Sequence, residues 1–383
     1  MTRRTTTRRD ALGALLALAS AAAGGPLAGA GATLAGAGIR AGTTLAALGG
    51  AGAAPAAFAA PPPRVLRLGF QKGGLLLLSK TRGALDRKLQ SLGWAVQWLE
   101  FPAGPQLLEG LNVGAIDFGV TGAPPPIFAQ AAGVNFVYVG AEPGQPNSEA
   151  ILVPRDSPVH GVADLKGKRV ALQKGSSSHY LLIALLRKAG LRYEDITPVF
   201  LAPSDARAAF QSGAVDAWTV WDPYMGIAQR ATQARVLADY TGIGAPWSFY
   251  EAQRQFADAH PEIVHAVIAQ LAEDGAWSNA HVPASVATLA PLLGLDAETL
   301  TALQSRVHYG AVPMAPAIAA SQQKIADLFF ELKIIPRRVD VAAASWCAGA
   351  RRAVLQGFRA RGRVPRAPSG CARRRPRRWR CAA

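Results

Sequence analysis

The sequence has 383 residues, of which 50% are hydrophobic, and its formal net charge at pH 7 is +16. The two ends supply all of this charge, because residues 1–60 carry five Arg and one Asp, and residues 347–383 carry twelve Arg and no acidic side chain. Residues 61–346 are neutral, with 24 basic and 24 acidic side chains, which argues against a nucleic-acid-binding domain with a basic face.

The N-terminus has the pattern of an export signal. The sequence MTRRTTTRRDALGALLALASAAAGG combines a basic start, an apolar run and small residues. Residues 7–12, TRRDAL, are similar to a twin-arginine signal, and an ordinary secretory signal is the alternative. Residues 21–60 are almost wholly Ala, Gly, Leu, Pro and Thr, a composition too uniform to specify a packed core. We therefore predict that residues 1–63 are an export signal and a linker.

From residue 64 onward, strand and helix patterns alternate. The apolar spacing predicts strands at 65–70, 94–101, 116–121 and 135–140, and helices at 75–93, 104–114 and 124–133. Strands and helices that alternate with short loops imply right-handed crossovers and a parallel sheet covered on both faces.

The same alternation restarts after a connecting segment at 149–153. It predicts strands at 168–173, 196–201 and 215–221, and helices at 162–167, 176–190, 203–213 and from residue 222. A second connecting segment is expected at 248–253, before helices at 261–279, 283–293 and 316–332. We therefore predict an α/β protein of two lobes, each a doubly wound sheet, joined by a two-segment hinge. The first lobe comprises residues 64–148 and 253–346, and the second comprises residues 149–252.

The C-terminal residues 347–383 read as an Arg-rich, disordered tail. The tail either binds anionic surfaces or is an extension without function. It contains all three cysteines, Cys347, Cys371 and Cys381, so the body has neither a disulfide nor a thiolate zinc site. The six histidines show no metal-ligating spacing, and we expect no metal and no cofactor.

The strand-to-helix junctions of both lobes are rich in glycine, hydroxyl and amide side chains. Ligands of open α/β sheets bind outside the carboxyl ends of the strands. A helix N-terminus suits an anion, because its backbone N–H groups are free and it carries a partial positive charge. We therefore predict that the helix starts near Thr121 and at Ser176–Ser178 clamp one oxyanion, and that Trp221, with Trp247, covers an apolar substituent.

These residues also have purely structural interpretations. A serine before a helix is a good N-cap, Asp-Pro is a good helix start, and paired glycines form tight turns. A cap, a turn, a core position or a solvated side chain is the alternative for Ser176, Gly73-Gly74, Asp222-Pro223, Trp221, His179, Lys72 and Lys174.

Motifs of common enzymes are missing. A serine hydrolase elbow needs G-x-S-x-G, and GSSSH at 175–179 lacks the second glycine. The sequence has no Walker phosphate loop, no G-x-G-x-x-G after the first strand and no HExxH. An enzyme on the same two-lobed scaffold stays open as an alternative, with His179 or Lys174 as its reactive group. A transcriptional effector domain is disfavoured because no helix-turn-helix segment is present.

The same segments resemble the aliphatic-sulfonate-binding proteins of bacterial import systems. The likeness extends over residues 64–346 and is most specific in FPAGPQ (101–106), PPIFAQAAG (125–133), QKGSSSH (173–179) and WDPY (221–224). The resemblance implies a monomeric, two-lobed periplasmic binding protein of type II-like fold. Such a protein closes on an alkanesulfonate and delivers it to the membrane permease of an ABC importer for sulfur acquisition. Related proteins that bind taurine, nitrate or aromatic sulfonates share the fold and are the alternatives.

The resemblance also implies the ligand-binding residues. They are Gln71, Gly73, Thr121, Gly122, Ser176, Ser177, Ser178 and His179 around the sulfonate, with Trp221 and Asp222 at the cleft wall. The family commonly has an acidic residue after Thr121-Gly122, whereas this chain has Ala123. We expect this difference to widen or shift the choice of ligand.

Overall fold

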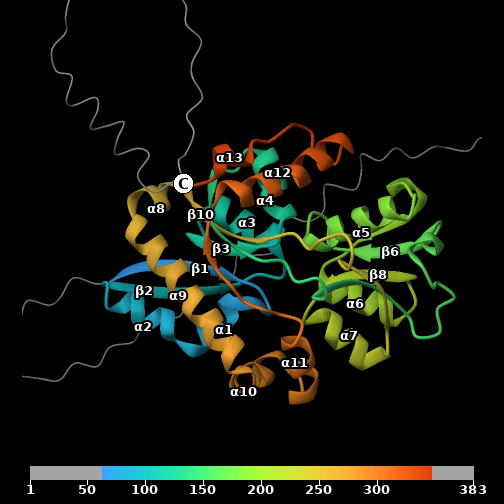
Figure 1. Ribbon diagram of the computed structural model, residues 1–383, viewed down its shortest axis with the longest axis horizontal. Coiled ribbons are helices and arrows are strands. Elements are labelled where there is room, and N and C mark those ends of the chain that lie inside the picture. Colours follow the sequence, from blue (N-terminus) through green and yellow to red (C-terminus); the bar gives the residue numbers. More distant parts are fainter. Residues whose placement is uncertain (1–62, 347–383) are drawn as a thin grey trace, which may run out of the picture. The chain divides into compact units, whose positions relative to one another are not determined.

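The computed structural model describes residues 63–346, which hold two β-sheets (Figure 1). The predicted export signal with most of its linker, and the Arg-rich tail with its three cysteines, lie outside the described residues. Residues from Pro61 onward belong to one compact unit, so the two sheets can be described together.

The first sheet has six strands in the order β11-β4-β10-β3-β1-β2. β1 pairs in parallel with β2 and β3, whereas β10 lies antiparallel between β3 and β4. The sheet is therefore mixed, and the prediction of an all-parallel sheet is wrong. The strands are β1 (Arg64–Phe70), β2 (Trp94–Glu100), β3 (Phe118–Thr121), β4 (Phe136–Glu142), β10 (Ser248–Gln253) and β11 (Val312–Pro313).

The second sheet has five strands in the order β7-β6-β8-β5-β9. β6 pairs in parallel with β7 and β8, and β5 lies antiparallel between β8 and β9. It repeats the arrangement of the first sheet, with β5 in the place of β10. The strands are β5 (Glu149–Val153), β6 (Arg169–Leu172), β7 (Thr197–Phe200), β8 (Ala217–Trp221) and β9 (Arg235–Asp239). We call each sheet with its helices the first and the second lobe.

The two connecting segments predicted at 149–153 and 248–253 are strands β5 and β10, inside the sheets. The chain crosses between the lobes just before them, at 143–148 and 240–247. Residues 248–252 therefore pair within the first lobe, and their assignment to the second lobe is corrected. The physical reason is that a short apolar run has no pattern that separates a buried antiparallel strand from a crossing segment.

Helices cover both faces of each sheet (Figure 1). The predicted helix at 75–93 is two helices, because the backbone at Gly83 is left-handed, with φ of 62°. Among the described residues no single helix is long and apolar enough to cross a membrane, and only α10 and α11, taken together across a 119° bend, match in length and composition. The helices are α1 (Gly74–Arg82), α2 (Ala84–Gln90), α3 (Gly104–Asn112), α4 (Pro124–Ala132), α5 (Ser177–Lys188), α6 (Pro203–Gln211), α7 (Tyr224–Thr232), α8 (Arg254–Ala259), α9 (Pro261–Ala280), α10 (Val282–Leu293), α11 (Ala297–Gln304), α12 (Pro316–Glu331) and α13 (Val341–Ala344), with short 3₁₀ turns at Val162–Leu165 and Tyr193–Asp195.

Four apolar clusters form the core, two in each lobe. In the first lobe, Leu68 of β1 and Leu271 of α9 belong to one cluster, whereas Leu107 of α3 and Phe329 of α12 belong to the other. Each sheet packs against apolar side chains on both of its faces. Its strands are therefore apolar on both faces, as in other α/β proteins with buried sheets.

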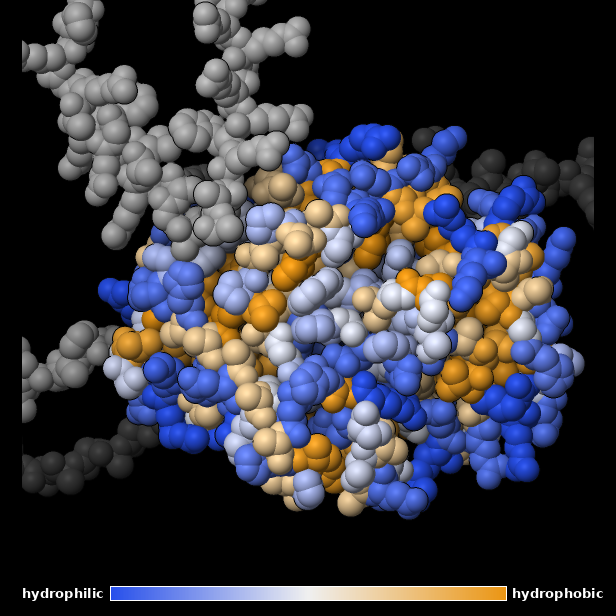
Figure 2. Space-filling view, viewed as in Figure 1, coloured by the Kyte–Doolittle hydropathy of each residue, from blue (hydrophilic) through white to orange (hydrophobic). Residues whose placement is uncertain are grey.

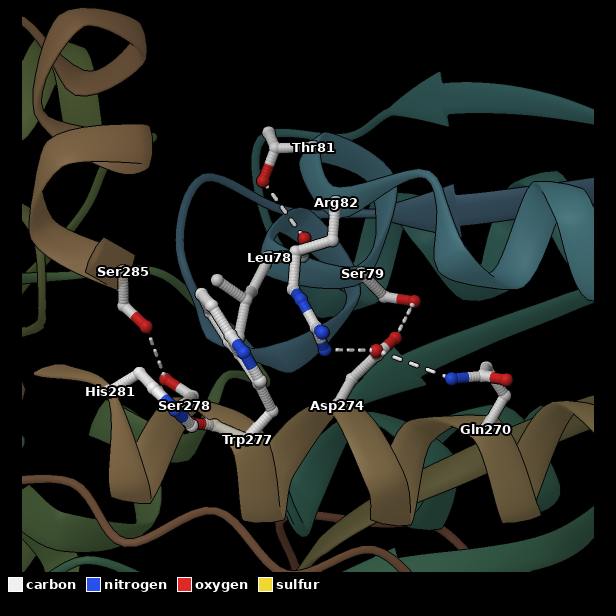
Figure 3. A network of polar contacts seen from close by, with 10 residues as sticks. All are labelled: Leu78, Ser79, Thr81, Arg82, Gln270, Asp274, Trp277, Ser278, His281 and Ser285. Atoms are coloured by element: carbon white, nitrogen blue, oxygen red, sulfur yellow. Dashed lines mark hydrogen bonds and ion pairs between the residues drawn. The ribbon is translucent and has the colours of Figure 1, made fainter.

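A buried polar network holds α1, α9 and α10 together (Figure 3). Asp274 of α9 is fully buried and accepts hydrogen bonds from Ser79 and Arg82 of α1. Ser278 of α9 lies 3.0 Å, Oγ to Oγ, from Ser285 of α10. Separating a buried carboxylate from its partners is costly, because it leaves a buried group without compensation, so these contacts fix the relative positions of the three helices.

Candidate ligand-binding cleft

A cavity of about 220 Å³ lies between the lobes. It is bordered by the first residues of five helices, three from the first lobe and two from the second. These are Gly73–Leu75 at α1, Gly104 at α3, Thr121, Gly122 and Pro125 at α4, Ser176 and Ser177 at α5, and Trp221–Pro223 at α7. The carboxyl ends of the parallel strands of both sheets therefore face one space, as the sequence predicted.

The lobes touch each other where two of these helix starts meet. A Cβ atom added to Gly122, before α4, would lie 2.8 Å from Cβ of Ser177, at the start of α5. Gly73 makes a similar approach, since a Cβ atom there would lie 3.1 Å from Cδ of Pro223. Both glycines let opposite backbones come close. The lobes are thus closed over the cavity.

Two serines of the cluster at 176–178, Ser176 and Ser177, border the cavity, but the Ser176 hydroxyl is bonded within its own loop. The Ser176 hydroxyl donates to the Gln173 carbonyl over 2.7 Å and lies 2.8 Å from the Ser178 hydroxyl. Ser178 is completely buried and does not border the cavity. Ser177 is half-buried and borders it.

His179 points away from the cavity into an aromatic setting. Its Nδ1 accepts a hydrogen bond from the Gly175 amide over 3.2 Å, and its Nε2 lies 3.1 Å from the Tyr193 hydroxyl. The ring stacks beside Phe128 of the first lobe. Burial lowers the pKa of His179 to about 4, and Lys174 adds to this effect. A neutral imidazole in this place supports the loop rather than contacts a ligand.

Thr121 and Gln71 reach the cavity from the first lobe, and both are tied to neighbouring groups. The Thr121 hydroxyl lies 2.7 Å from Oε1 of Glu251, a fully buried side chain on β10. Burial raises the pKa of Glu251 well above its ordinary value and so favours the neutral form of this carboxyl. The side-chain nitrogen of Gln71 donates to the Val120 carbonyl over 3.0 Å, and this bond does not involve the side-chain oxygen.

Three carboxyl groups border the cavity, of which the sequence analysis identified only Asp222. Burial raises the pKa of Glu142 to about 7 and that of Glu149 to about 7. Burial also raises the pKa of Asp222 to about 6, against the opposing effect of Arg306. Glu142 ends β4 and Glu149 begins β5, so they flank the first crossing, and no local motif in the sequence marks them.

Trp221 is half-buried, borders the cavity and makes an edge contact with Tyr224. Trp247 does not border the cavity and packs against the core on the α4 and α12 side. The Ala123 side chain is also in that core and away from the cavity, so the missing acidic group leaves no gap in the lining. Lys72 borders the cavity, whereas Lys174 lies over the Phe200 ring.

Comparison with known proteins gives a consistent set of relatives. Residues 93–281 match the family described as NMT1/THI5 like. An aliphatic sulfonates-binding protein of Escherichia coli K12 is 46% identical over 286 residues, which is 74% of this chain and 89% of that protein. A protein of the same description from Bacillus subtilis 168 is 30% identical over 72% of this chain and 84% of that protein. The alkanesulfonate-binding protein SsuA from Xanthomonas axonopodis pv. citri bound to MOPS superimposes with a TM-score of 0.72 and 42% identity, over 75% of this chain and 99% of that one.

Proposed function

Since this chain belongs to the family of periplasmic aliphatic sulfonate-binding proteins, we propose that it captures alkanesulfonates in the cleft between its lobes and delivers them to an ABC importer for sulfur acquisition. One observation supports the cleft as the capture site above all others. The N-termini of α4 and α5, from opposite lobes, meet at Gly122 and Ser177 beside the cavity.

The sulfonate is held by uncharged donors. The backbone N–H groups of Gly122 and Ser177, with the hydroxyls of Thr121 and Ser177, surround one oxyanion. The first turn of α4 adds no N–H donor, because it begins with Pro124, Pro125 and Pro126. Gln71 completes the first-lobe side, and Gly73 keeps α1 close to the second lobe. Ser176, Ser178 and His179 shape the loop from behind, so their contribution is to position Ser177.

This arrangement discriminates between anions by charge. A sulfonate is a monoanion that needs hydrogen-bond donors only, and the start of α5 and the backbone of Gly122 supply them. A second negative charge, as on sulfate or phosphate, would be repelled by the carboxyl groups of Glu149 and Asp222 at the same cavity. Because the pKa values of Glu149 and Asp222 are raised, part of their negative charge is neutralised by protons near neutral pH. These carboxyl groups therefore repel a monoanion less than a dianion.

Closure couples binding to delivery. A ligand that contacts both α4 and α5 binds the closed form better than an open one, and so shifts the population toward closure. The closed form is then the one that the membrane permease receives. We propose that the protein acts as a monomer after export by the N-terminal signal.

A second candidate ligand is an amino-sulfonate such as taurine, and a specific observation favours it. Oε1 of Glu142 and Oε2 of Glu149 are buried without a hydrogen-bond partner among the described residues, and both side chains border the cavity. An ammonium group on the ligand would give these oxygens a donor of opposite charge. An enzyme of the same scaffold is disfavoured, because His179 is turned away from the cavity.

Calorimetric titration of the full chain tests the proposal. The ligands are ethanesulfonate, pentanesulfonate, taurine, nitrate and sulfate, and we expect a sulfonate to bind and sulfate to give no heat. Ser177→Ala should weaken sulfonate binding about tenfold, because one charge-assisted hydrogen bond of about 1–2 kcal/mol is lost. Ser204→Ala, at an exposed serine in the first turn of α6, is the matched control and should bind as the wild type does. Silence for every sulfonate contradicts the proposed function.

A further inference from the structure

His179 lies where the two lobes meet, behind the residues that lead into α5. We call residues 173–177 the α5 loop; its Ser176 and Ser177 border the cavity. The imidazole is 3% exposed, and its Nδ1 accepts the amide proton of Gly175 over 3.2 Å. The backbone at Gly175 is left-handed, with φ of 76°, as the bend of the loop requires. The ring of His179 therefore holds the α5 loop at its sharpest point.

The contacts of the imidazole require a neutral ring. Nδ1 faces a donor, the Gly175 N–H, so it carries no proton in this structure. The single proton of the neutral ring is then on Nε2, which lies 3.1 Å from the Tyr193 hydroxyl. A second proton, on Nδ1, would set two donors against each other and break the bond to Gly175. Protonation of His179 is thus incompatible with this form of the α5 loop.

The first lobe covers the ring. Phe128 of α4 stacks beside it, with 6.3 Å between ring centroids and 20° between planes, and the ring of Phe329 of α12 lies 6.4 Å away. A Cβ atom added to Gly175 would lie 3.5 Å from the Phe128 ring, so Phe128 also covers the Gly175 bond. Figure 1 shows α5 of the second lobe facing α4 and α12, and Figure 2 shows apolar side chains at the surface where α12 approaches α5. Opening of the lobes removes this cover and admits water to His179.

The groups that surround the ring in the closed form disfavour its charged state. The second lobe contributes Tyr193 and, from β7, Phe200. Burial raises the pKa of Tyr193 to about 12, so its hydroxyl stays neutral. Among the described residues, the charged side chain that acts on the ring is Lys174, which repels a second positive charge. Burial, with this smaller effect of Lys174, lowers the pKa of His179 from 6.5 to about 4.

We infer that His179 is a proton-sensitive positioning residue, which holds the α5 loop and permits closure only while its ring is neutral, so that the protein captures its anion at neutral pH and releases it in acid. This inference rests on the proposed function and adds a regulation of the same site. The sign follows from linkage, because the closed form excludes the proton and the open form accepts it near the ordinary pKa of 6.5. The contribution of His179 to affinity is therefore full above about pH 6.5 and is lost as the pH falls toward 4.

The test is calorimetric titration of the full chain with pentanesulfonate and with taurine, at pH 7.5 and at pH 5. The wild type is compared with His179→Asn, whose Oδ1 takes the place of Nδ1, accepts from Gly175 and cannot gain a proton. Between pH 7.5 and pH 5 the affinity of the wild type, relative to that of the variant, should fall roughly tenfold or more. Glu142, Glu149 and Asp222 also bind protons in this range, but in both proteins, so the ratio of the two affinities reports on His179.

A matched control removes another imidazole. His265 is exposed on α9, beside Trp346 and away from the cavity, and His265→Asn should follow the wild type at both pH values. The same pH dependence in wild type and His179→Asn, with ligand bound at pH 7.5, overturns the inference and leaves the proposed function standing. Absence of binding of both ligands to the wild type at both pH values overturns both. If His179→Asn is unfolded in thermal melting or too weak to titrate, His179→Gln carries the same comparison.

Discussion

Arg306 Nη1 lies 3.2 Å from Asp222 Oδ2, and this ion pair joins the first lobe to the second beside the cleft. Arg306 follows α11, and its other terminal nitrogen donates to Gln229 on α7 over 3.2 Å. The two paired side chains are 24% and 11% exposed. A second pair, Arg230 with Asp296, also links α7 to α11, but its side chains are 61% and 41% exposed. Because exposed pairs stabilise little, the first pair is the one expected to favour closure.

Arg306→Met should weaken sulfonate binding about tenfold. The substitution keeps an apolar stem against α11 but leaves Asp222 buried without its cation in the closed form, which is the form that holds ligand. Calorimetric titration with hexanesulfonate measures the change. Arg230→Met, which removes the exposed pair, should alter affinity by less than about twofold. Equal losses in the two variants would show that neither pair is specific to closure.

Gly122→Ala should abolish most binding while the unliganded protein keeps its thermal stability. The added Cβ atom would lie 2.8 Å from Cβ of Ser177, a distance that requires the lobes to separate. The three atoms nearest to the added Cβ all lie on Ser177, so we expect the clash to fall on the second lobe and not within the first. We expect a loss of tenfold or more in affinity, by calorimetry, and an unchanged melting temperature without ligand.

Two further variants check the steric reading of Gly122. Gly161→Ala places the same methyl group where the nearest atom is 4.0 Å away, and it should bind normally. Adding Ser177→Gly to Gly122→Ala removes the clashing Cβ atom, and should restore part of the affinity although a hydroxyl donor is lost. A double variant as weak as Gly122→Ala alone would mean that closure does not depend on this contact.

The sequence predicted the helix starts that border the cavity better than it predicted the rest of the lining. Helix starts are visible as Gly, Ser and Pro at strand ends, so Gly122 and Ser177 could be placed at the cleft in advance. The direction of each side chain could not, because successive helical residues are about 100° apart, and His179 turns into the core only two positions after Ser177. Leu289 and Leu303 lie on helices whose apolar residues look like ordinary core in the sequence. Both side chains border the cavity, on two helices that meet at a bend of 119°.

Glu251→Gln should leave stability at pH 7 nearly unchanged, because burial raises the pKa of the carboxyl it replaces and favours its neutral form. Gln can keep a hydrogen bond to the Thr121 hydroxyl, which now lies 2.7 Å from Oε1 of Glu251. Glu251→Leu removes the shorter of the two hydrogen bonds of the Thr121 hydroxyl and leaves only the Gly122 carbonyl at 3.1 Å, at a destabilisation of about 1 kcal/mol. Urea denaturation of the three proteins measures the difference. An equally large loss in Glu251→Gln would show that the carboxyl is ionised and that its charge matters.

The stability of the protein should fall between about pH 4.5 and pH 7, and Glu142→Gln should make this fall less steep. Burial raises the pKa of Glu142 from 4.5 to about 7, so in this range the folded protein keeps a proton that the unfolded chain releases. Stability that depends on this proton is complete below pH 4.5 and is lost as the pH rises to about 7. The slope contributed by one such group is about 1.4 kcal/mol per pH unit.

Urea denaturation at pH 5, 6 and 7 measures this slope. The difference between wild type and Glu142→Gln should grow in favour of the variant by about 2 kcal/mol from pH 5 to pH 7. The variant still accepts the hydrogen bond that the Tyr250 hydroxyl donates to Glu142 over 3.1 Å, so packing changes little. Glu149 and Glu251 contribute to the pH dependence of stability equally in both proteins. Their contributions cancel in the difference between wild type and variant, so this difference reports on Glu142 alone. Glu109 is an exposed glutamate on α3, and the stability of Glu109→Gln should change with pH as that of the wild type does. Parallel lines for Glu142→Gln as well would mean that Glu142 is ionised in the folded protein throughout this range.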